Sequence, residues 1–144
     1  MPAGTSYLAK EGMIGKTVCR ETYNADAYYK FTVKNNFLHA IHPVGWFRKI
    51  DIELDGKAWD TKDSYFVLRG QFFRIPDMHT ISEVYWNLCE PAEIYLKQDR
   101  ELEKGTHEIT VTFTTSLLED TQILDRERKY SDRVEFAQST IELV

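Results

Sequence analysis

Hydrophobic and polar side chains alternate along four segments of the chain, at residues 27–33, 50–54, 92–96 and 109–113. Each segment places an apolar side chain at every second position. This period of two is typical of a β-strand with one buried and one exposed face. We therefore expect four antiparallel strands that share one core, formed by Tyr29, Phe31, Ile50, Ile52, Ile94, Val111 and Phe113.

Shorter apolar runs predict further strands at 65–68 and 71–75, and a last one near 134–144. Glycine-containing dipeptides, which favour tight turns, separate several of these runs. They are Asp55-Gly56, Arg69-Gly70 and Lys104-Gly105.

Seven or eight short strands joined by turns predict an all-β fold, either an antiparallel β-sandwich or a jelly roll. A length of 144 residues fits one domain. We expect residues 17–144 to form this single domain. Residues 1–16 hold three of the seven glycines and show little periodicity, which predicts a loose N-terminal arm.

The segment 77–88 is compatible with two structures. Its first residues follow helical spacing and Asp77 can cap a helix, whereas Trp86 and Leu88 alternate as they would in a strand. We expect one helical turn near 77–81 followed by a strand.

Charge and hydropathy exclude several classes of partner. The net charge of −5 and the pI of about 5.4 argue against binding to the phosphates of nucleic acids. No apolar stretch reaches the ~18–20 residues of a membrane span, and residues 1–6 lack the features of a signal peptide. We therefore expect a cytoplasmic protein, in which Cys19 and Cys89 are reduced and buried.

His39-x-x-His42 is the sharpest candidate for a metal site, because imidazoles bind zinc, copper and iron. A pair at this spacing on a strand points to opposite faces, so we expect no metal on this chain. The sequence contains no nucleophile motif and no phosphate-binding glycine loop. Glu119, Asp120 and Asp125 are interpreted as solvated acidic residues. We expect no catalytic residue and no cofactor here.

The segment 35–47 combines aromatic side chains with two histidines in a predicted loop. Because an apolar loop is costly to leave in water, it packs either on the domain's own core or against another molecule. The external alternatives are a protein interface and a sugar or aryl ligand. The candidate partner or substrate contacts are Phe37, His39, His42 and Trp46.

Longer motifs follow one another in a fixed order. Phe47–Gly56 is similar to the pattern I-x-D-I-x-V-x-V-D-G, Trp86–Ile94 to W-x-F-x-E-P-A, and Leu102–Val111 to L-x-x-G-x-H-E-V-x-V. The strand Tyr28–Val33 and the runs Tyr65–Gly70 and Arg74–Met78 complete the series. Over about residues 27–130, these segments together resemble the β (small) subunit of the bacterial C-glycoside deglycosidases.

This resemblance implies an accessory β subunit in a heteromeric lyase, inactive alone. Its partner is a larger TIM-barrel α subunit that carries a divalent metal of the Mn or Mg type and the catalytic base. The substrate, bound through the complex, is a 3-oxo C-glycoside whose carbon–carbon bond breaks by deprotonation at sugar C2 and β-elimination. The small subunit completes or closes the site without catalysing the reaction itself.

Two other classes stay open from the residues themselves. An intracellular carbohydrate-binding β-sandwich module also uses exposed aromatic residues, and binding of free sugar by the isolated chain would identify it. A small cupin-like enzyme is disfavoured because its metal sites use an H-x-H pair that this chain lacks. A metal assay on the isolated chain would distinguish it from the other two classes.

Overall fold

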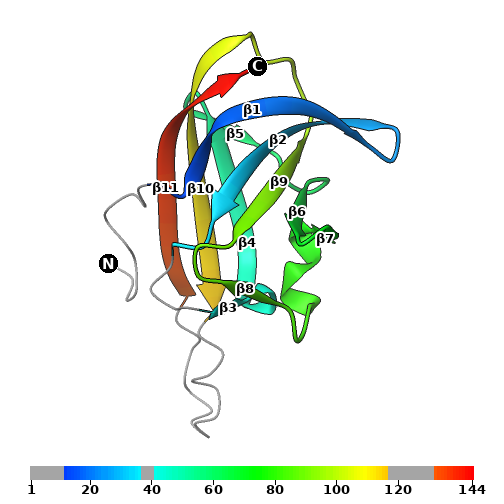
Figure 1. Cartoon of the computed structure of the whole chain (residues 1–144), viewed down its shortest axis with the longest axis vertical. Helices are drawn as coiled ribbons and strands as arrows, with labels where there is room; N and C mark the ends of the chain where they lie inside the picture. The colour runs from blue at the N-terminus through cyan, green and yellow to red at the C-terminus, as the bar shows by residue number, and fades with distance from the viewer. Residues whose placement is uncertain (1–11, 37–40, 117–131) are drawn as a thin grey trace, which may run out of the picture.

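The computed structural model describes residues 12–36, 41–116 and 132–144, which form strands and two short 3-10 helices (Figure 1). No helix in these ranges is long and apolar enough to cross a membrane. In chain order the elements are β1 (Ile14–Tyr23), β2 (Asp26–Lys34), β3 (Ile41–Pro43), η1 (Val44–Trp46), β4 (Phe47–Leu54), β5 (Lys57–Trp59), β6 (Tyr65–Leu68), β7 (Gln71–Arg74), η2 (Ile75–Thr80), β8 (Tyr85–Asn87), β9 (Pro91–Lys97), β10 (Gly105–Ser116) and β11 (Asp132–Leu143).

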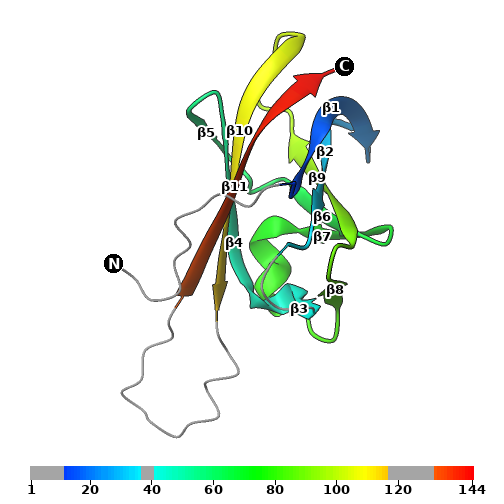
Figure 2. The ribbon, with the colours of Figure 1, turned by 60° about the vertical axis from the view of Figure 1, so that its left-hand side comes forward.

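One curved sheet supplies both layers of the domain. Its strand order is β5-β4-β10-β11-β1-β2-β9-β6-β7, while β3 and β8 form a separate two-stranded ribbon. The described pairings are antiparallel except where β1 meets β11 in parallel, at Thr17↔Glu142 and Val18↔Leu143. Around this junction the sheet folds over, so that β4 and β10 face β2 and β9 (Figures 1 and 2). The predicted all-β, sandwich-like fold is confirmed.

The core lies between the two layers. All seven core residues predicted from the alternation are at most 2 % exposed. Aromatic rings join the layers: the rings of Tyr29 on β2 and Trp59 on β5 lie 6.0 Å apart, and those of Phe47 on β4 and Phe66 on β6 lie 6.1 Å apart. The period-two pattern therefore identifies the buried faces on both layers.

Three hairpins use two-residue turns in which both residues have positive φ. The φ angles are 50° and 68° at Asn24-Ala25, 52° and 78° at Asp55-Gly56, and 50° and 79° at Arg69-Gly70. Two consecutive positive φ angles are the signature of a type I′ turn, whose twist matches that of the flanking strands. Both dipeptides predicted as turns at 55–56 and 69–70 are confirmed.

The ambiguous segment after β7 contains both expected structures. The 3-10 helix η2 covers Ile75–Thr80, and the strand β8 follows at Tyr85–Asn87. Next to it, η1 approaches so closely that a Cβ added to Gly45 would lie 2.2 Å from the carbonyl oxygen of Ile81. Only glycine fits at residue 45 without a shift of one of these segments.

Three expectations differ from the structure. Strand β1 begins at Ile14, inside the arm predicted for residues 1–16. The segment 35–47 contains β3 and η1, and Phe47 is a core residue at 1 % exposure. The cysteines are free but not buried, because Cys19 is half-buried and Cys89 is exposed in a turn.

Candidate functional site

Two of the predicted contact residues fall in described elements that are neighbours in the chain, His42 in β3 and Trp46 in η1, and β3 lies beside β8 (Figure 1). Trp46 ends η1 and is half-buried. The backbone of His42 pairs with that of Trp86 in the ribbon. Phe37 and His39, together with the side chain of His42, lie outside the described part of the structure.

The ribbon presents apolar side chains to solvent at this end. Tyr85 is 46 % exposed and Leu88 is 53 % exposed. Leu88 and Cys89 are the central residues of a turn closed by a hydrogen bond from the Glu90 N–H to the Asn87 carbonyl oxygen, at 3.0 Å. We call Tyr85, Leu88 and Cys89 the β8 surface.

An arginine from another hairpin holds this turn. The Nη1 atom of Arg69 lies 2.6 Å from each carboxylate oxygen of Glu90, and Nη2 donates to the carbonyl oxygen of Tyr85 at 2.9 Å. Glu90 also accepts a hydrogen bond from the Asn87 N–H at 3.0 Å. The type I′ turn at Arg69-Gly70 thus projects its arginine onto the β8–β9 connection, and we call this the Arg69–Glu90 clamp.

Buried hydrogen bonds anchor the same turn from the core side. The indole N–H of Trp86 donates to the Glu90 carbonyl oxygen at 2.7 Å. The side-chain amide of Asn35, which is fully buried, donates to the Trp86 carbonyl oxygen at 2.7 Å. The Cys89 N–H donates in turn to the carbonyl oxygen of Asn35 at 2.9 Å. The motif from Trp86 to Glu90 therefore builds a fixed corner rather than a loose loop.

The hydrogen bonds of Glu90 stabilise its charged form. Burial alone raises the pKa of its carboxyl group, but the hydrogen bonds from Arg69 and from the Asn87 N–H outweigh burial and lower that pKa below its ordinary value. Glu90 is therefore a carboxylate near neutral pH, and its charge is matched by the guanidinium of Arg69.

A second corner joins the turn between β4 and β5 to the start of β10. The His107 Nδ1 atom lies 2.7 Å from Asp55 Oδ2, and its Nε2 atom lies 2.6 Å from the carbonyl oxygen of Glu103. The Glu108 N–H donates to Asp55 Oδ1 at 2.9 Å. The hydrogen bond to Asp55, and then that to Glu103, raise the pKa of His107. The pKa of Asp55 is lowered, first by the hydrogen bond from His107.

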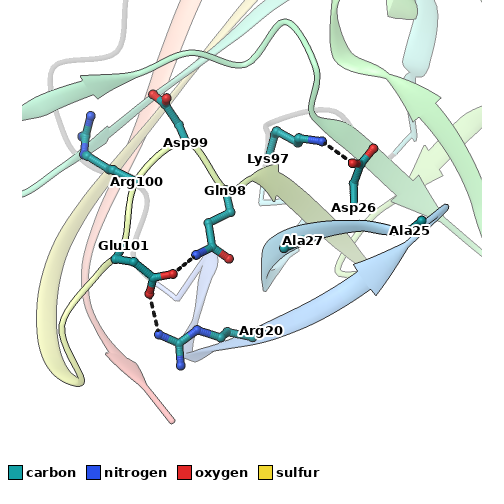
Figure 3. A pocket seen from close by; sticks show the side chains of 9 residues that line it. All are labelled: Arg20, Ala25, Asp26, Ala27, Lys97, Gln98, Asp99, Arg100 and Glu101. Carbon is teal, nitrogen blue, oxygen red and sulfur yellow. Dashed lines mark hydrogen bonds and ion pairs between the residues drawn. The ribbon is translucent and has the colours of Figure 1, made fainter.

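An open depression of about 620 Å³ lies between the turn of β1–β2 and the connection after β9 (Figure 3). Four of its charged side chains form two ion pairs: Arg20 lies 3.0 Å from Glu101, and Lys97 lies 3.0 Å from Asp26. All four are exposed or half-buried, so the depression is a solvated surface of paired charges rather than a substrate pocket.

An aromatic cluster covers the outer face of the layer that contains β2 and β9. The rings of Tyr23 and Phe72 stack with their centres 3.9 Å apart and an interplanar angle of 2°. Tyr28, Tyr65 and Tyr95 pack around this pair. Because these rings contact one another across β1, β2, β6, β7 and β9, the cluster stabilises the outer layer.

Metal-binding chemistry finds little support among the described residues. No group of three or more His, Cys, Asp or Glu side chains is placed there to hold a metal ion. His107 is engaged by Asp55, and His79 lies exposed in the last turn of η2. The acidic residues Glu119, Asp120 and Asp125 lie outside the described residues.

Sequence reasoning missed the β8 surface. The sequence pattern assigns Tyr85 to helical spacing and Leu88 to either a helix or a strand, whereas the structure places Leu88 in the centre of a turn. Polar residues and glycine dominate turns, so an exposed leucine there is unusual.

The sequence of this chain matches a known protein family. The model of the family described as C-glycoside deglycosidase beta subunit matches residues 9–117, about three quarters of the chain. No curated protein matches the chain significantly. The matched range includes both the Arg69–Glu90 clamp and the corner of Asp55 and His107, which are built from the motifs that carry the family resemblance. The chain belongs to the C-glycoside deglycosidase beta subunit family.

Proposed function

We propose that this chain is the accessory subunit of a heteromeric enzyme that cleaves the carbon–carbon bond of 3-oxo C-glycosides. The single observation that carries the proposal is the family match over residues 9–117. A beta subunit implies an alpha subunit, and we assign the chemistry to that partner. The proposed partner is a TIM-barrel protein that holds a divalent metal of the Mn or Mg type, and the complex is expected in the cytoplasm.

The chemistry of the proposed substrate explains why the reaction calls for a base and a metal. A C-glycoside lacks the leaving oxygen that glycosidase carboxylates protonate. A ketone at sugar C3 acidifies the proton on C2, so a base can remove it. A divalent metal held by the partner would supply the positive charge that favours this deprotonation. The bond from C1 to the aglycone carbon then breaks as the C1–C2 double bond forms. The aglycone carbon gains a proton, and an unsaturated keto-sugar remains.

The role proposed for this chain is to bind the large subunit and complete its site. Phe37, His39, His42 and Trp46 are the residues we expect to contact the partner or substrate. Trp46 is half-buried at the end where Tyr85 and Leu88 are exposed. Aromatic residues are enriched at protein interfaces, which supports this assignment.

Trp46→Ala tests this role. If Trp46 is a contact residue, the variant binds the large subunit less tightly, by ~2 kcal/mol if it is a hot spot, while the free chain keeps its melting temperature. If Trp46 belongs to the core, the free chain instead loses ~3–5 kcal/mol of unfolding free energy. Thermal melts of the free chain, set beside binding measurements, separate the two outcomes.

Reconstitution tests the whole proposal. The purified chain, the purified large subunit and their mixture are each incubated with a 3-oxo C-glycoside, and release of the aglycone is followed by chromatography. We expect no turnover by this chain alone and full turnover by the mixture. Equal turnover by this chain alone, free of the large subunit, would overturn the assignment.

A further inference from the structure

We propose that the β8 surface, formed by Tyr85, Leu88 and Cys89, is the rigid apolar contact through which this chain binds its large subunit. The inference rests on the proposed function, which supplies the partner. It adds residues that neither the family match nor the sequence motifs assign to binding.

The apolar side chains of the β8 surface are exposed to solvent. Among the described residues, the exposed large hydrophobic side chains are Tyr85, Leu88 and Val144. Two of these three lie within four residues of each other, whereas Val144 is at the C-terminus, at the opposite end of the molecule (Figure 1). Single exposed apolar residues are ordinary, but a tyrosine and a leucine exposed three positions apart in one short segment are candidates for a contact surface.

Rigidity is the second argument. The turn that carries Leu88 is fixed by the Arg69–Glu90 clamp, by the Trp86 indole and by Asn35. Cys89 has a φ angle of 60°, a left-handed conformation that is costly for a residue other than glycine. These contacts hold the strained turn in one shape before any partner binds. A preordered contact loses little conformational entropy on association, which favours its use in a permanent complex.

The surroundings fit a protein partner. Tyr85 pairs with Pro43 in the ribbon, and Val44, the first residue of η1, donates its N–H to the Val84 carbonyl oxygen at 2.9 Å. The β8 surface is therefore continuous with η1, where Trp46 lies. The Arg69–Glu90 ion pair stands beside it, with the Arg69 side chain 47 % exposed. An apolar centre with a charged neighbour is the usual anatomy of a protein interface.

The occupant we assign is the large subunit rather than a second copy of this chain. The family name describes a beta subunit, which implies an alpha subunit as its partner, and obligate interfaces are rich in apolar side chains. Assembly of this chain with itself through Leu88 is the competing occupancy, and it has a distinct outcome in the experiment below.

The experiment uses Leu88→Glu with Val144→Glu as the matched control, since both replace an exposed aliphatic side chain by a carboxylate. Affinity of each full-length variant for the purified large subunit is measured by calorimetry, and each free chain is melted. We expect Leu88→Glu to weaken binding at least tenfold, as for an interface hot spot, and Val144→Glu to bind as the wild type does. Both free variants should keep the wild-type melting temperature.

Alkylation of Cys89 by N-ethylmaleimide supplies a second readout that needs no substitution. Peptide mass spectrometry follows Cys89 in the free chain and in the complex, with Cys19 as the internal reference. We expect Cys89 to react in the free chain and to be protected in the complex. If Leu88→Glu unfolds the chain, this protection decides the matter.

The outcomes separate the two proposals. If the wild-type chain does not bind the large subunit, the proposed function and this inference are both wrong. If it binds, but Leu88→Glu binds equally well or Cys89 stays reactive in the complex, only the β8 surface is wrong. A free chain that dimerises and becomes monomeric on Leu88→Glu assigns the surface to a second copy and also overturns the inference.

Discussion

His107 is held between two hydrogen-bond acceptors, the carboxylate of Asp55 and the carbonyl oxygen of Glu103. A neutral imidazole has one donor, so both contacts are satisfied only when His107 is protonated. The raised pKa of His107 and the lowered pKa of Asp55 agree with this geometry. The histidine of the family motif therefore joins the Asp55 turn to the start of β10.

The contact between His107 and Asp55 should make stability depend on pH, and His107→Gln should remove that dependence. The contribution of Asp55 is present above its ordinary pKa of 3.8 and is lost as the pH falls through its lower folded-state value. The contribution of His107 is present below 6.5 and is lost as the pH rises through its raised folded-state value. The wild type should exceed the variant by ~1–3 kcal/mol between these limits and by less at higher pH.

Denaturant unfolding at several pH values measures this difference. The exposed residue His79 offers a control, because His79→Gln should follow the wild type throughout. A constant gap between His107→Gln and the wild type from pH 5 to pH 9 would contradict the role assigned to the charge.

A side chain at residue 45 should destabilise the fold. The Cβ of Gly45→Ala would lie 2.2 Å from the Ile81 carbonyl oxygen, so η1 and η2 must separate. We expect a loss of ~1–3 kcal/mol, typical of overpacking. Gly15→Ala is the control, because its Cβ would meet Thr32 at an ordinary 3.4 Å and its free energy of unfolding should change little. Equal stability of both variants would contradict the close approach.

Elements whose side chains alternate strictly were predictable from the sequence, because burial of one face imposes the period of two. Strand β1 was not, because its register against β2 shifts between Ile14 and Val18 and breaks the alternation. Cys19 is half-buried because it follows the buried Val18 in β1 and therefore points away from the core. The place of Phe47 in β4 was not predictable, because η1 ends at Trp46 and the strand follows it directly, with no turn residue between them.

The candidate site was predictable only in part. The structure places Trp46 at the end of η1 and the backbone of His42 in the β3–β8 ribbon, while the contact roles of Phe37, His39, His42 and Trp46 stay predictions. The exposure of Leu88 was not predictable, because it depends on a turn held by Arg69 and Asn35, which are distant in sequence. A local sequence pattern does not predict such tertiary contacts.

Arg69→Gln tests the clamp as a link between two hairpins. The variant loses the contacts to Glu90 and to the Tyr85 carbonyl oxygen, so the β8–β9 turn should open more often. Global stability should change by less than about 1 kcal/mol, because the Arg69 side chain is 47 % exposed and its ion pair is screened by solvent. Hydrogen exchange at the amides of Asn87 and Cys89 should be faster, and association with the large subunit several-fold weaker.

Arg74→Gln is the matched control, since Arg74 is exposed and contacts only the Lys62 carbonyl oxygen and Asp77 among its described partners. Its amides at 87 and 89 should exchange at the wild-type rate. Unchanged exchange in Arg69→Gln would show that the clamp does not hold the turn.

At the scale of the whole molecule, the described chain is a curved sheet closed around one core, with two polar corners built from the family's motifs. One corner fixes the turn of β4–β5 against β10, and the other fixes the β8 surface. Strand β8, at which Tyr85 and Leu88 are exposed, lies next to β3 and away from the C-terminus (Figures 1 and 2). This distribution fits the contact that we propose with an alpha subunit.

The most direct test of the central claim is the composition of the complex in the native cell. This chain is tagged at its C-terminus, purified under mild conditions, and the proteins recovered in constant molar ratio are identified by mass spectrometry. The account predicts a C-glycoside deglycosidase alpha subunit in stoichiometric amount, and turnover of a 3-oxo C-glycoside by the purified material. Recovery of this chain alone, or in constant ratio with a partner of another class, would contradict it.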